Sequence, residues 1–380
     1  MEVSGTNTSL SDVLGTFDRW LLLDDLGAVE YTIALAVANR FEADPLWGFI
    51  VAASGGAKTE LIASLSGLPE IHPLSDLTAQ TFISGMKGQS KASLLMRLEP
   101  GTVLTLKDFT TVLTIHREQR QMILSQLREI YDGSYRKAFG TGEQVDWEGK
   151  LGFIAGVTPV IDSHYSVYQV LGERFIQYRT KQPPLKELAS RALDNSGSER
   201  RMREELSAAV ATYVEGLHLP PAPPDLDPEV KQAIIALAIL TVHGRSGVVR
   251  DGGGELELVP EPEAPTRLAK QLKLLGSALA VMHGHTVVGA EEYVLVKKVA
   301  LDTIPANRLR VLRALRQRYI PVDTSEIAEA VRYPTSTTRR VLEDLVGHGM
   351  ADTEKPGQTR AHTWWLTEET RSWWEEAEAL

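Results

Sequence analysis

The chain has no cysteine among its 380 residues. Without thiols it forms neither a disulfide nor a thiolate-ligated metal site. It also lacks any apolar run approaching the roughly 18 residues of a membrane span, so no membrane contact is expected. The polar segment at residues 1–11 has no basic stretch followed by an apolar one, which is the pattern of an export signal. We therefore expect a cytoplasmic protein.

Positive charge is in the minority, because 50 acidic side chains face 40 basic ones and give a net charge of −10. This balance argues against a surface that is basic throughout and leaves room for a local basic face. The hydrophobic share of 43% is ordinary for a globular protein. The length allows two or three domains.

Four segments follow from the patterning. Residues 1–45 are predicted to be helical, and residues 46–182 alternate short apolar strands with helices. Such alternation predicts an α/β fold with a parallel sheet and helices on both of its faces. Residues 183–303 are predicted to be mainly helical, with a β-hairpin at 248–259 around a run of three glycines. Residues 304–380 form a separate module.

A turn of small residues lies between the apolar strand that ends at Val51 and an apolar helix pattern. This is the context of a P-loop, in which backbone N–H groups cradle phosphates, a lysine reaches their oxygens and a hydroxyl holds Mg²⁺. Ala52 and Ala57 stand where the strict motif has glycine, and a glycine-rich turn without a ligand is the alternative. The predicted ATP-binding residues are Ser54, Gly55, Gly56, Ala57, Lys58 and Thr59, with Thr59 also a Mg²⁺ ligand.

Asp108 follows the apolar strand at residues 103–106. An acid at the end of such a strand, downstream of a P-loop, is the Walker B arrangement, whose acids hold Mg²⁺ and polarise the attacking water. Lys107 occupies the position of the first of the two usual acids. Either Asp108 serves both purposes or hydrolysis is impaired; the alternative is a loop acid that caps a buried strand.

Two further residues fit an ATPase by their order along the chain. Thr158 follows the strand at 151–157. In P-loop ATPases of the AAA+ type a polar residue at this position helps to orient the lytic water, although such a residue is also ordinary at the end of a strand. Arg174 precedes Phe175, and such an arginine can complete the ATP site of a neighbouring subunit. A surface or salt-bridge role is the alternative for Arg174.

These motifs give residues 46–301 a resemblance to the AAA+ module of the minichromosome maintenance (MCM) helicases. The chain looks most similar to the compact MCM-like ATPases of phages, phage satellites and integrative elements. The matching segments are Ala57-Lys58-Thr59, Leu77-Thr78-Ala79, Lys137-Ala138, Glu173-Arg174-Phe175 and Pro265-Thr266-Arg267-Leu268.

The resemblance implies a P-loop AAA+ core, a helical lid and a C-terminal winged helix. It implies ATP hydrolysis between the subunits of a homo-oligomer, a hexameric ring, with Arg174 acting in trans and Arg267 sensing the γ-phosphate. Lys137, with its neighbour Arg136, would grip DNA in the central pore. A replication initiator or a primase is an expected partner.

The chain departs from that family at several positions. The P-loop glycines are replaced, Lys107-Asp108 stands for Asp-Glu, and Thr158-Pro159 stands for Asn-Pro. The first two departures bear on the catalytic rate. No DNA-encircling, zinc-binding domain fits into residues 1–45, which bears on processive unwinding by this chain alone.

Residues 304–380 have the pattern of a winged helix-turn-helix, with three short helices followed by two strands. Between residues 304 and 340 there are eight basic side chains against three acidic ones. A protein–protein module is the alternative, because Glu343 and Asp344 lie on the third helix. The predicted DNA contacts in the third helix and the wing are Thr335, Ser336, Thr337, Arg339, Arg340, Lys355 and Arg360.

The sequence thus favours an ATP-hydrolysing, MCM-like DNA helicase or translocase that works as a ring in the replication of a mobile element. The first alternative is an ATP-regulated DNA-binding initiator, helicase loader or transcription regulator without unwinding activity. The second is a scaffold with a degenerate, inactive site.

Overall fold

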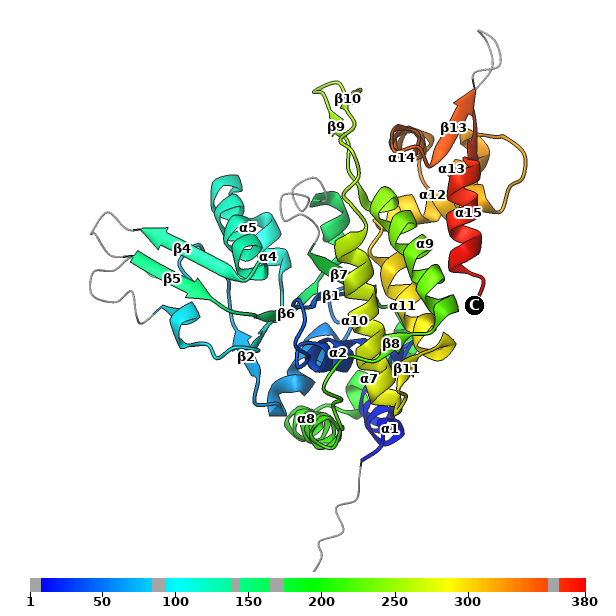
Figure 1. The fold of residues 1–380 in the computed structure, drawn as a ribbon. Helices are drawn as coiled ribbons and strands as arrows, with labels where there is room; N and C mark the ends of the chain where they lie inside the picture. Colours follow the sequence, from blue (N-terminus) through cyan, green and yellow to red (C-terminus); the bar gives the residue numbers. More distant parts are fainter. Residues whose placement is uncertain (1–7, 84–92, 139–143, 165–173, 355–361) are drawn as a thin grey trace, which may run out of the picture. The chain divides into compact units, whose positions relative to one another are not determined.

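The computed structural model describes residues 8–83, 93–138, 144–164, 174–354 and 362–380 (Figure 1). The chain divides into two compact units, which are described separately. The first comprises residues 1–161, 170–225 and 274–288, and the second comprises residues 162–169, 226–273 and 289–380. The described part of the chain contains no helix long and apolar enough to cross a membrane.

A five-stranded sheet forms the centre of the first unit. Its order is β2-β3-β6-β1-β7, and every neighbouring pair is parallel. The strands are β1 (Trp47–Val51), β2 (Ile71–Leu74), β3 (Val103–Leu106), β6 (Gly152–Val157) and β7 (Phe175–Arg179). This confirms the predicted α/β core. Strand β2 was missed by sequence reasoning, because it has only four residues and one of them is Pro73.

The sheet is buried on both faces, as parallel sheets in α/β folds usually are. Strands β1, β3 and β6 have no exposed residue. Aromatic side chains fill the core around Phe175, which stacks on Phe49 with ring centres 4.0 Å apart and packs against Trp47 at 5.0 Å. This packing fixes β1, and with it the turn that follows β1.

Helices and one hairpin complete the first unit. The N-terminal segment predicted to be helical contains α1 (Leu10–Trp20) and α2 (Gly27–Ala38). A hairpin of β4 (Ser134–Ala138) and β5 (Gln144–Glu148) pairs antiparallel just before β6. The other helices are α3 (Lys58–Ala63), α4 (Thr110–Thr114), α5 (Arg117–Tyr131), α7 (Leu185–Asp194) and α8 (Glu199–Glu215), with short 3-10 turns at Ser64–Gly67, Leu94–Arg97 and Pro159–His164.

The second unit contains helix α9 (Pro228–Arg245), which lies alongside the C-terminal helix α15 (Glu368–Ala377). A hairpin of β9 (Val249–Arg250) and β10 (Leu256–Leu258) confirms the hairpin expected at 248–259. Helix α10 (Thr266–His283) spans the boundary between the units, and α11 (Ala290–Asp302) follows the short strand β11 (Val287–Val288). Asp225–Leu226 forms the two-residue strand β8.

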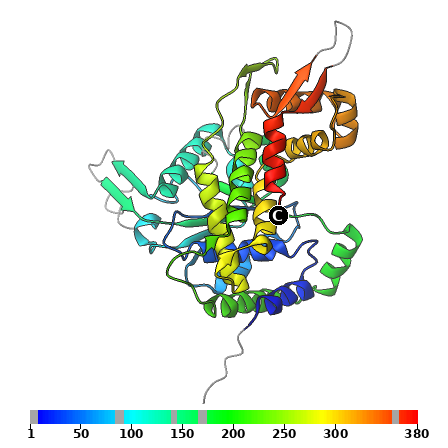
Figure 2. The ribbon, with the colours of Figure 1, turned by 45° about the vertical axis from the view of Figure 1, so that its right-hand side comes forward.

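The module after α11 has winged-helix architecture, with α12 (Ala306–Arg316), α13 (Thr324–Val331) and α14 (Thr335–Gly347). Its sheet has the order β12-β14-β13, from Val322–Asp323, Thr363–Leu366 and Ala351–Glu354 (orange to red in Figure 2). The N-cap of α13 is Asp323, whose carboxylate accepts from Ser325 N at 2.7 Å. The Thr324 hydroxyl accepts from Trp364 Nε1 at 2.9 Å.

Candidate functional site

In the turn after β1, the side chain of Lys58 forms hydrogen bonds with the backbone of the turn itself. Lys58 begins α3, is 8% exposed, and donates from Nζ to the carbonyl oxygens of Ala52 at 2.6 Å and Ala53 at 2.8 Å. Burial lowers the pKa of Lys58, and the nearby Asp108 charge opposes that effect. The ammonium group is therefore held at the loop, close to the Asp108 carboxylate.

Two residues of the loop adopt left-handed backbone conformations. Gly55 has φ of 78°, and Ala57 has φ of 61°. Ala57 stands where the strict P-loop motif has glycine, so the chain keeps the loop conformation without the residue that favours it. Gly56 lies in a tight space, since a Cβ there would lie 3.0 Å from the Ala52 Cβ and 3.0 Å from the Ala53 carbonyl oxygen.

The loop fits a phosphate group. Within the described residues, the amides of Gly55, Ala57, Lys58 and Thr59 donate to no protein acceptor. A Cβ built at Gly55 meets nothing within 4 Å, so the space beside the loop is open. Unpaired amides beside an ammonium group are the donors that an anion such as phosphate requires. Ser54 is exposed beside them.

Asp108 and Thr158 are joined through Thr110, which sequence reasoning missed. Asp108 Oδ1 accepts from Thr110 N at 2.9 Å. The Thr110 hydroxyl accepts from Thr158 N at 3.1 Å and lies 3.2 Å from the Thr158 hydroxyl. The first of these bonds could have been predicted from the sequence, because an aspartate side chain often accepts a hydrogen bond from the backbone amide two residues later. Asp108 and Thr158 therefore follow β3 and β6 at the same edge of the sheet as the loop after β1.

The candidate Mg²⁺ ligands are the Thr59 hydroxyl and the Asp108 carboxylate. Both residues are exposed, and oxygen atoms of these types are the ligands that Mg²⁺ prefers. Glu60, next to Thr59, forms a two-point ion pair with Arg203 of α8, at 2.8 and 2.9 Å. This pair ties α3, and so the loop that precedes it, to α8.

Arg174 is bound within its own chain. It is 4% exposed, and its Nη2 donates to Asp132 Oδ1 at 2.8 Å and Oδ2 at 2.6 Å. Its guanidinium also lies over the Tyr131 ring, 5.3 Å from the ring centre. This geometry corresponds to the salt-bridge alternative for Arg174.

Other predicted cations have partners too. Arg136 in β4 pairs with Asp146 at 3.0 Å and Glu148 at 3.3 Å on the facing strand. Lys137 is its neighbour in β4. Arg267, at the start of α10, lies 3.6 Å from Glu263.

The third helix of the winged helix, α14, presents its N-terminal half to solvent. Thr335, Ser336, Thr337, Arg339 and Arg340 are all exposed. Val341, Leu342 and Leu345 are buried on the opposite face, which follows from their helical spacing. Lys355 and Arg360 lie outside the described residues.

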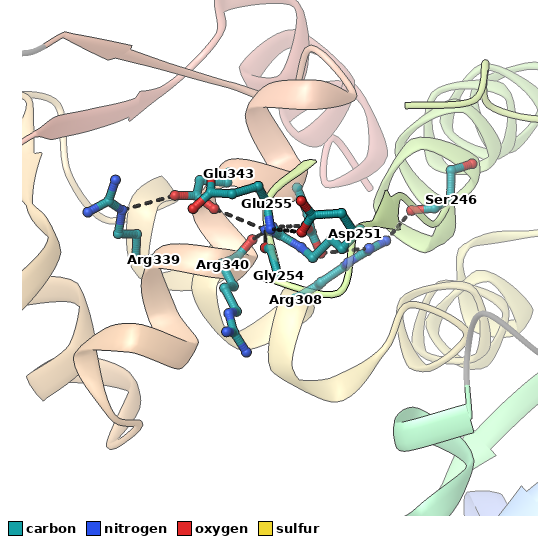
Figure 3. Close-up of polar contacts among 10 residues, drawn as sticks. Ser246, Asp251, Gly254, Glu255, Arg308, Arg339, Arg340 and Glu343 are labelled. Atoms are coloured by element: carbon teal, nitrogen blue, oxygen red, sulfur yellow. Dashed lines mark hydrogen bonds and ion pairs between the residues drawn. The ribbon is translucent and has the colours of Figure 1, made fainter. Parts of the chain in front are cut away.

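The β9–β10 hairpin packs against α14, in a contact that joins residues about 90 positions apart (Figure 3). Arg250 donates to the Arg340 carbonyl at 2.9 Å, to Asp344 Oδ1 at 2.6 Å and to Glu343 Oε2 at 3.2 Å. Glu343 also accepts from Arg339 at 2.9 Å, and Asp344 from Arg308 at 3.0 Å.

The acidic pair on α14 is thus neutralised from three sides. Arg250, Arg308 and Arg339 together supply three positive charges against the two carboxylates. The Glu343 and Asp344 carboxylates are therefore each paired with guanidinium groups of this unit. No local sequence signal pointed to Arg250.

Comparison with known proteins supports the helix-turn-helix. Residues 306–355, from α12 to the end of β13, match the model of the IclR helix-turn-helix domain. A solved structure described as a "putative ATPase" from Cytophaga hutchinsonii aligns over 78% of this chain and 85% of its own, with 13% identity and a TM-score of 0.42. Comparison with curated proteins gives no match. The chain is thus an α/β protein that carries a C-terminal helix-turn-helix domain.

Proposed function

We propose that this chain binds ATP with Mg²⁺ at the loop after β1 and duplex DNA through its winged helix, so that nucleotide controls its action on DNA. The observation that carries the proposal is the common position of Lys58, Asp108 and Thr158. They follow β1, β3 and β6, and ligands of parallel sheets bind at the carboxyl ends of the strands.

The residues divide the work as follows. The free amides of the loop and the Lys58 ammonium group hold the phosphates, and the Thr59 hydroxyl with the Asp108 carboxylate holds the cation. Bound ATP supplies a phosphoryl group for transfer to water. Asp108 and Thr158, linked through Thr110, orient that water in this proposal.

The finer form of the proposal is an MCM-like helicase or translocase that acts as a hexameric ring. Three features support it: the parallel sheet with β6 between β1 and β3, the β4–β5 hairpin that carries Lys137 just before β6, and the winged helix after the helical segment. Lys137 would contact the DNA backbone inside such a ring, and Arg267 would sense the γ-phosphate.

A second candidate is an ATP-regulated DNA-binding protein without unwinding activity, such as an initiator, a loader or a transcription regulator. Two observations favour it. Arg174 is engaged by Asp132 in its own chain, and Lys107 replaces one of the two usual acids. The first feature leaves Arg174 less available to a neighbouring subunit, and the second removes one of the acids that activate water, so both favour slow ATP hydrolysis.

Three measurements test these proposals. Lys58→Ala should abolish ATP binding, because it removes the ammonium group at the loop, and unchanged affinity would refute the P-loop assignment.

Asp108→Asn should keep ATP binding and stop turnover; normal turnover would place catalysis on another carboxylate. Displacement of a strand from forked DNA by the wild-type protein separates the helicase from the regulator.

A further inference from the structure

A cavity of about 320 Å³ lies in the winged helix between α12 and α13. Three exposed arginines line it, Arg310 and Arg313 from α12 and Arg332 from the end of α13. Its other lining residues are neutral, namely Ala314, Gln317, Ala330 and Val331. The Arg310 guanidinium lies over the Tyr333 ring, 5.4 Å from its centre.

The charge of these three arginines is not compensated. Three other arginines of the module are paired, Arg308 with Asp344, Arg316 with Glu378 and Arg339 with Glu343. Arg318, Arg340 and Arg371 form no ion pair within the described residues, and they do not line the cavity. Within the described ranges, Arg310, Arg313 and Arg332 form no ion pair with an acid. In a chain with a net charge of −10, this cavity is a local concentration of free positive charge.

The position of Arg332 places the cavity beside the start of the third helix. Arg332 ends α13 in a left-handed conformation, with φ of 57°, and α14 begins at Thr335. Apart from Ala57, Arg332 is the only residue other than glycine with positive φ in the described chain. The turn therefore holds a guanidinium group three residues before the exposed N-terminal half of α14.

The hairpin limits how a ligand reaches α14. Arg250 bonds the Arg340 carbonyl, Glu343 and Asp344, and a Cβ on Gly347 would lie 2.9 Å from Val259. These contacts leave Glu343 and Asp344, in the C-terminal half of the helix, only partly exposed. The open part of α14 is the end next to Arg332.

We infer that Arg310, Arg313 and Arg332 form a second anion site that binds phosphates of the DNA backbone while the N-terminal half of α14 lies against the duplex. This inference rests on the proposed DNA-binding function. Guanidinium groups match phosphate oxygens in charge and hydrogen-bond geometry, and such contacts position a protein on DNA without reading its sequence.

The test compares full-length wild type with an Arg313→Ala/Arg332→Gly variant. Glycine at position 332 removes the guanidinium and tolerates the left-handed backbone. The matched control is Arg318→Ala, an exposed arginine of the same module outside the cavity. Binding of a duplex is measured by fluorescence anisotropy from 50 to 200 mM salt, on several unrelated sequences.

Loss of two phosphate contacts should reduce the slope of log K against log salt by about 1.8 and weaken binding equally on every sequence. Arg318→Ala should leave the slope near that of wild type. If the double variant keeps the wild-type slope, the second site is refuted and the proposed function stands. If wild type binds no duplex, both are refuted.

A direct titration with inorganic phosphate distinguishes the source of the anion. Wild type should show no saturable phosphate binding below the millimolar range, because the three guanidinium groups are exposed to water and a single small anion gains little from exposed charges. Tight phosphate binding that the double variant loses, together with an unchanged salt slope on DNA, would identify a free-phosphate site and overturn the assignment to DNA.

Discussion

Arg250 in the β9–β10 hairpin and Asp344 in α14 are 2.6 Å apart, and this ion pair joins the hairpin to the third helix of the winged helix. Both side chains are mostly buried, with exposures of 18% and 14%. Removing one partner of such a pair leaves the other charge poorly solvated and unpaired. Loss of this pair should therefore affect both the stability of the module and the charge on the surface of α14.

The first prediction is that Arg250→Ala weakens duplex binding by about tenfold, equivalent to about 1.4 kcal/mol, because Glu343 and Asp344 lose a shared cation beside the DNA-facing part of α14. Anisotropy at 50 mM salt measures the effect. Adding Glu343→Gln and Asp344→Asn to Arg250→Ala should restore affinity. Arg200→Ala, which breaks the exposed pair with Glu204 in α8, is the matched control. Tighter binding by Arg250→Ala would show instead that the hairpin blocks DNA.

The second prediction concerns Ala57, which has φ of 61° in the loop after β1. Ala57→Gly should raise the free energy of unfolding by about 1 kcal/mol, because glycine adopts this conformation without a steric penalty. Ala63→Gly is the control. It makes the same change in the right-handed α3 and should lower stability by about 1 kcal/mol. Urea titrations of the three proteins measure both, and a decrease for Ala57→Gly would contradict the strained backbone.

The sequence was sufficient to predict that the candidate ATP-site residues lie together at one edge of the sheet. Each of Lys58, Asp108 and Thr158 lies just after an apolar strand, and parallel strands bring their carboxyl ends to one edge. The strand order was not accessible in this way. In the structure β6 separates β1 from β3, so Asp108 does not follow the strand next to the P-loop strand.

Partners that are distant along the chain could not be predicted. The bond of Arg174 to Asp132 spans 42 residues, and the bond of Arg250 to Asp344 spans 94. A sequence motif gives the type of a side chain and its position on an element, whereas an ion pair depends on tertiary packing. The motif therefore identified Arg174 as a candidate ATPase residue but could not show that its side chain is buried and paired with Asp132.

The third prediction is that Arg174 stabilises its own subunit. Arg174→Ala and Asp132→Ala should each lower the free energy of unfolding, and the double variant should show a coupling of about 1 to 3 kcal/mol, because the pair is charge-assisted and Arg174 is buried. The exposed Arg200–Glu204 pair should couple by only about 0.3 to 0.5 kcal/mol.

Mixing experiments examine the alternative for Arg174. If Arg174 serves only its own subunit, the folded Arg174→Ala chain should hydrolyse ATP by itself, and an equal amount of Lys58→Ala chain should not raise its turnover. Recovery of turnover on mixing would instead show that Arg174 completes the site of a neighbouring chain.

The last prediction is that the second unit loses stability in mild acid through His348. This residue is 6% exposed at the end of α14. Burial lowers the pKa of His348 to about 4, the charges of Arg308 and His243 act in the same direction, and Asp344 opposes them. In the unfolded chain the pKa is about 6.5. Between these values the unfolded chain binds more protons, so stability is complete above pH 6.5 and falls as the pH is lowered toward 4.

His348→Gln should flatten that dependence, because glutamine is neutral throughout this range and close to histidine in size. His116→Gln, at an exposed position in the first unit, controls for the loss of one histidine. Urea unfolding followed by tryptophan fluorescence at pH 4.5, 5.5, 6.5 and 7.5 measures the slope, since Trp364 and Trp374 are buried in the same module. An equal slope in wild type and His348→Gln would show that His348 becomes protonated without unfolding the module, and the assigned cause of the acid sensitivity would be wrong.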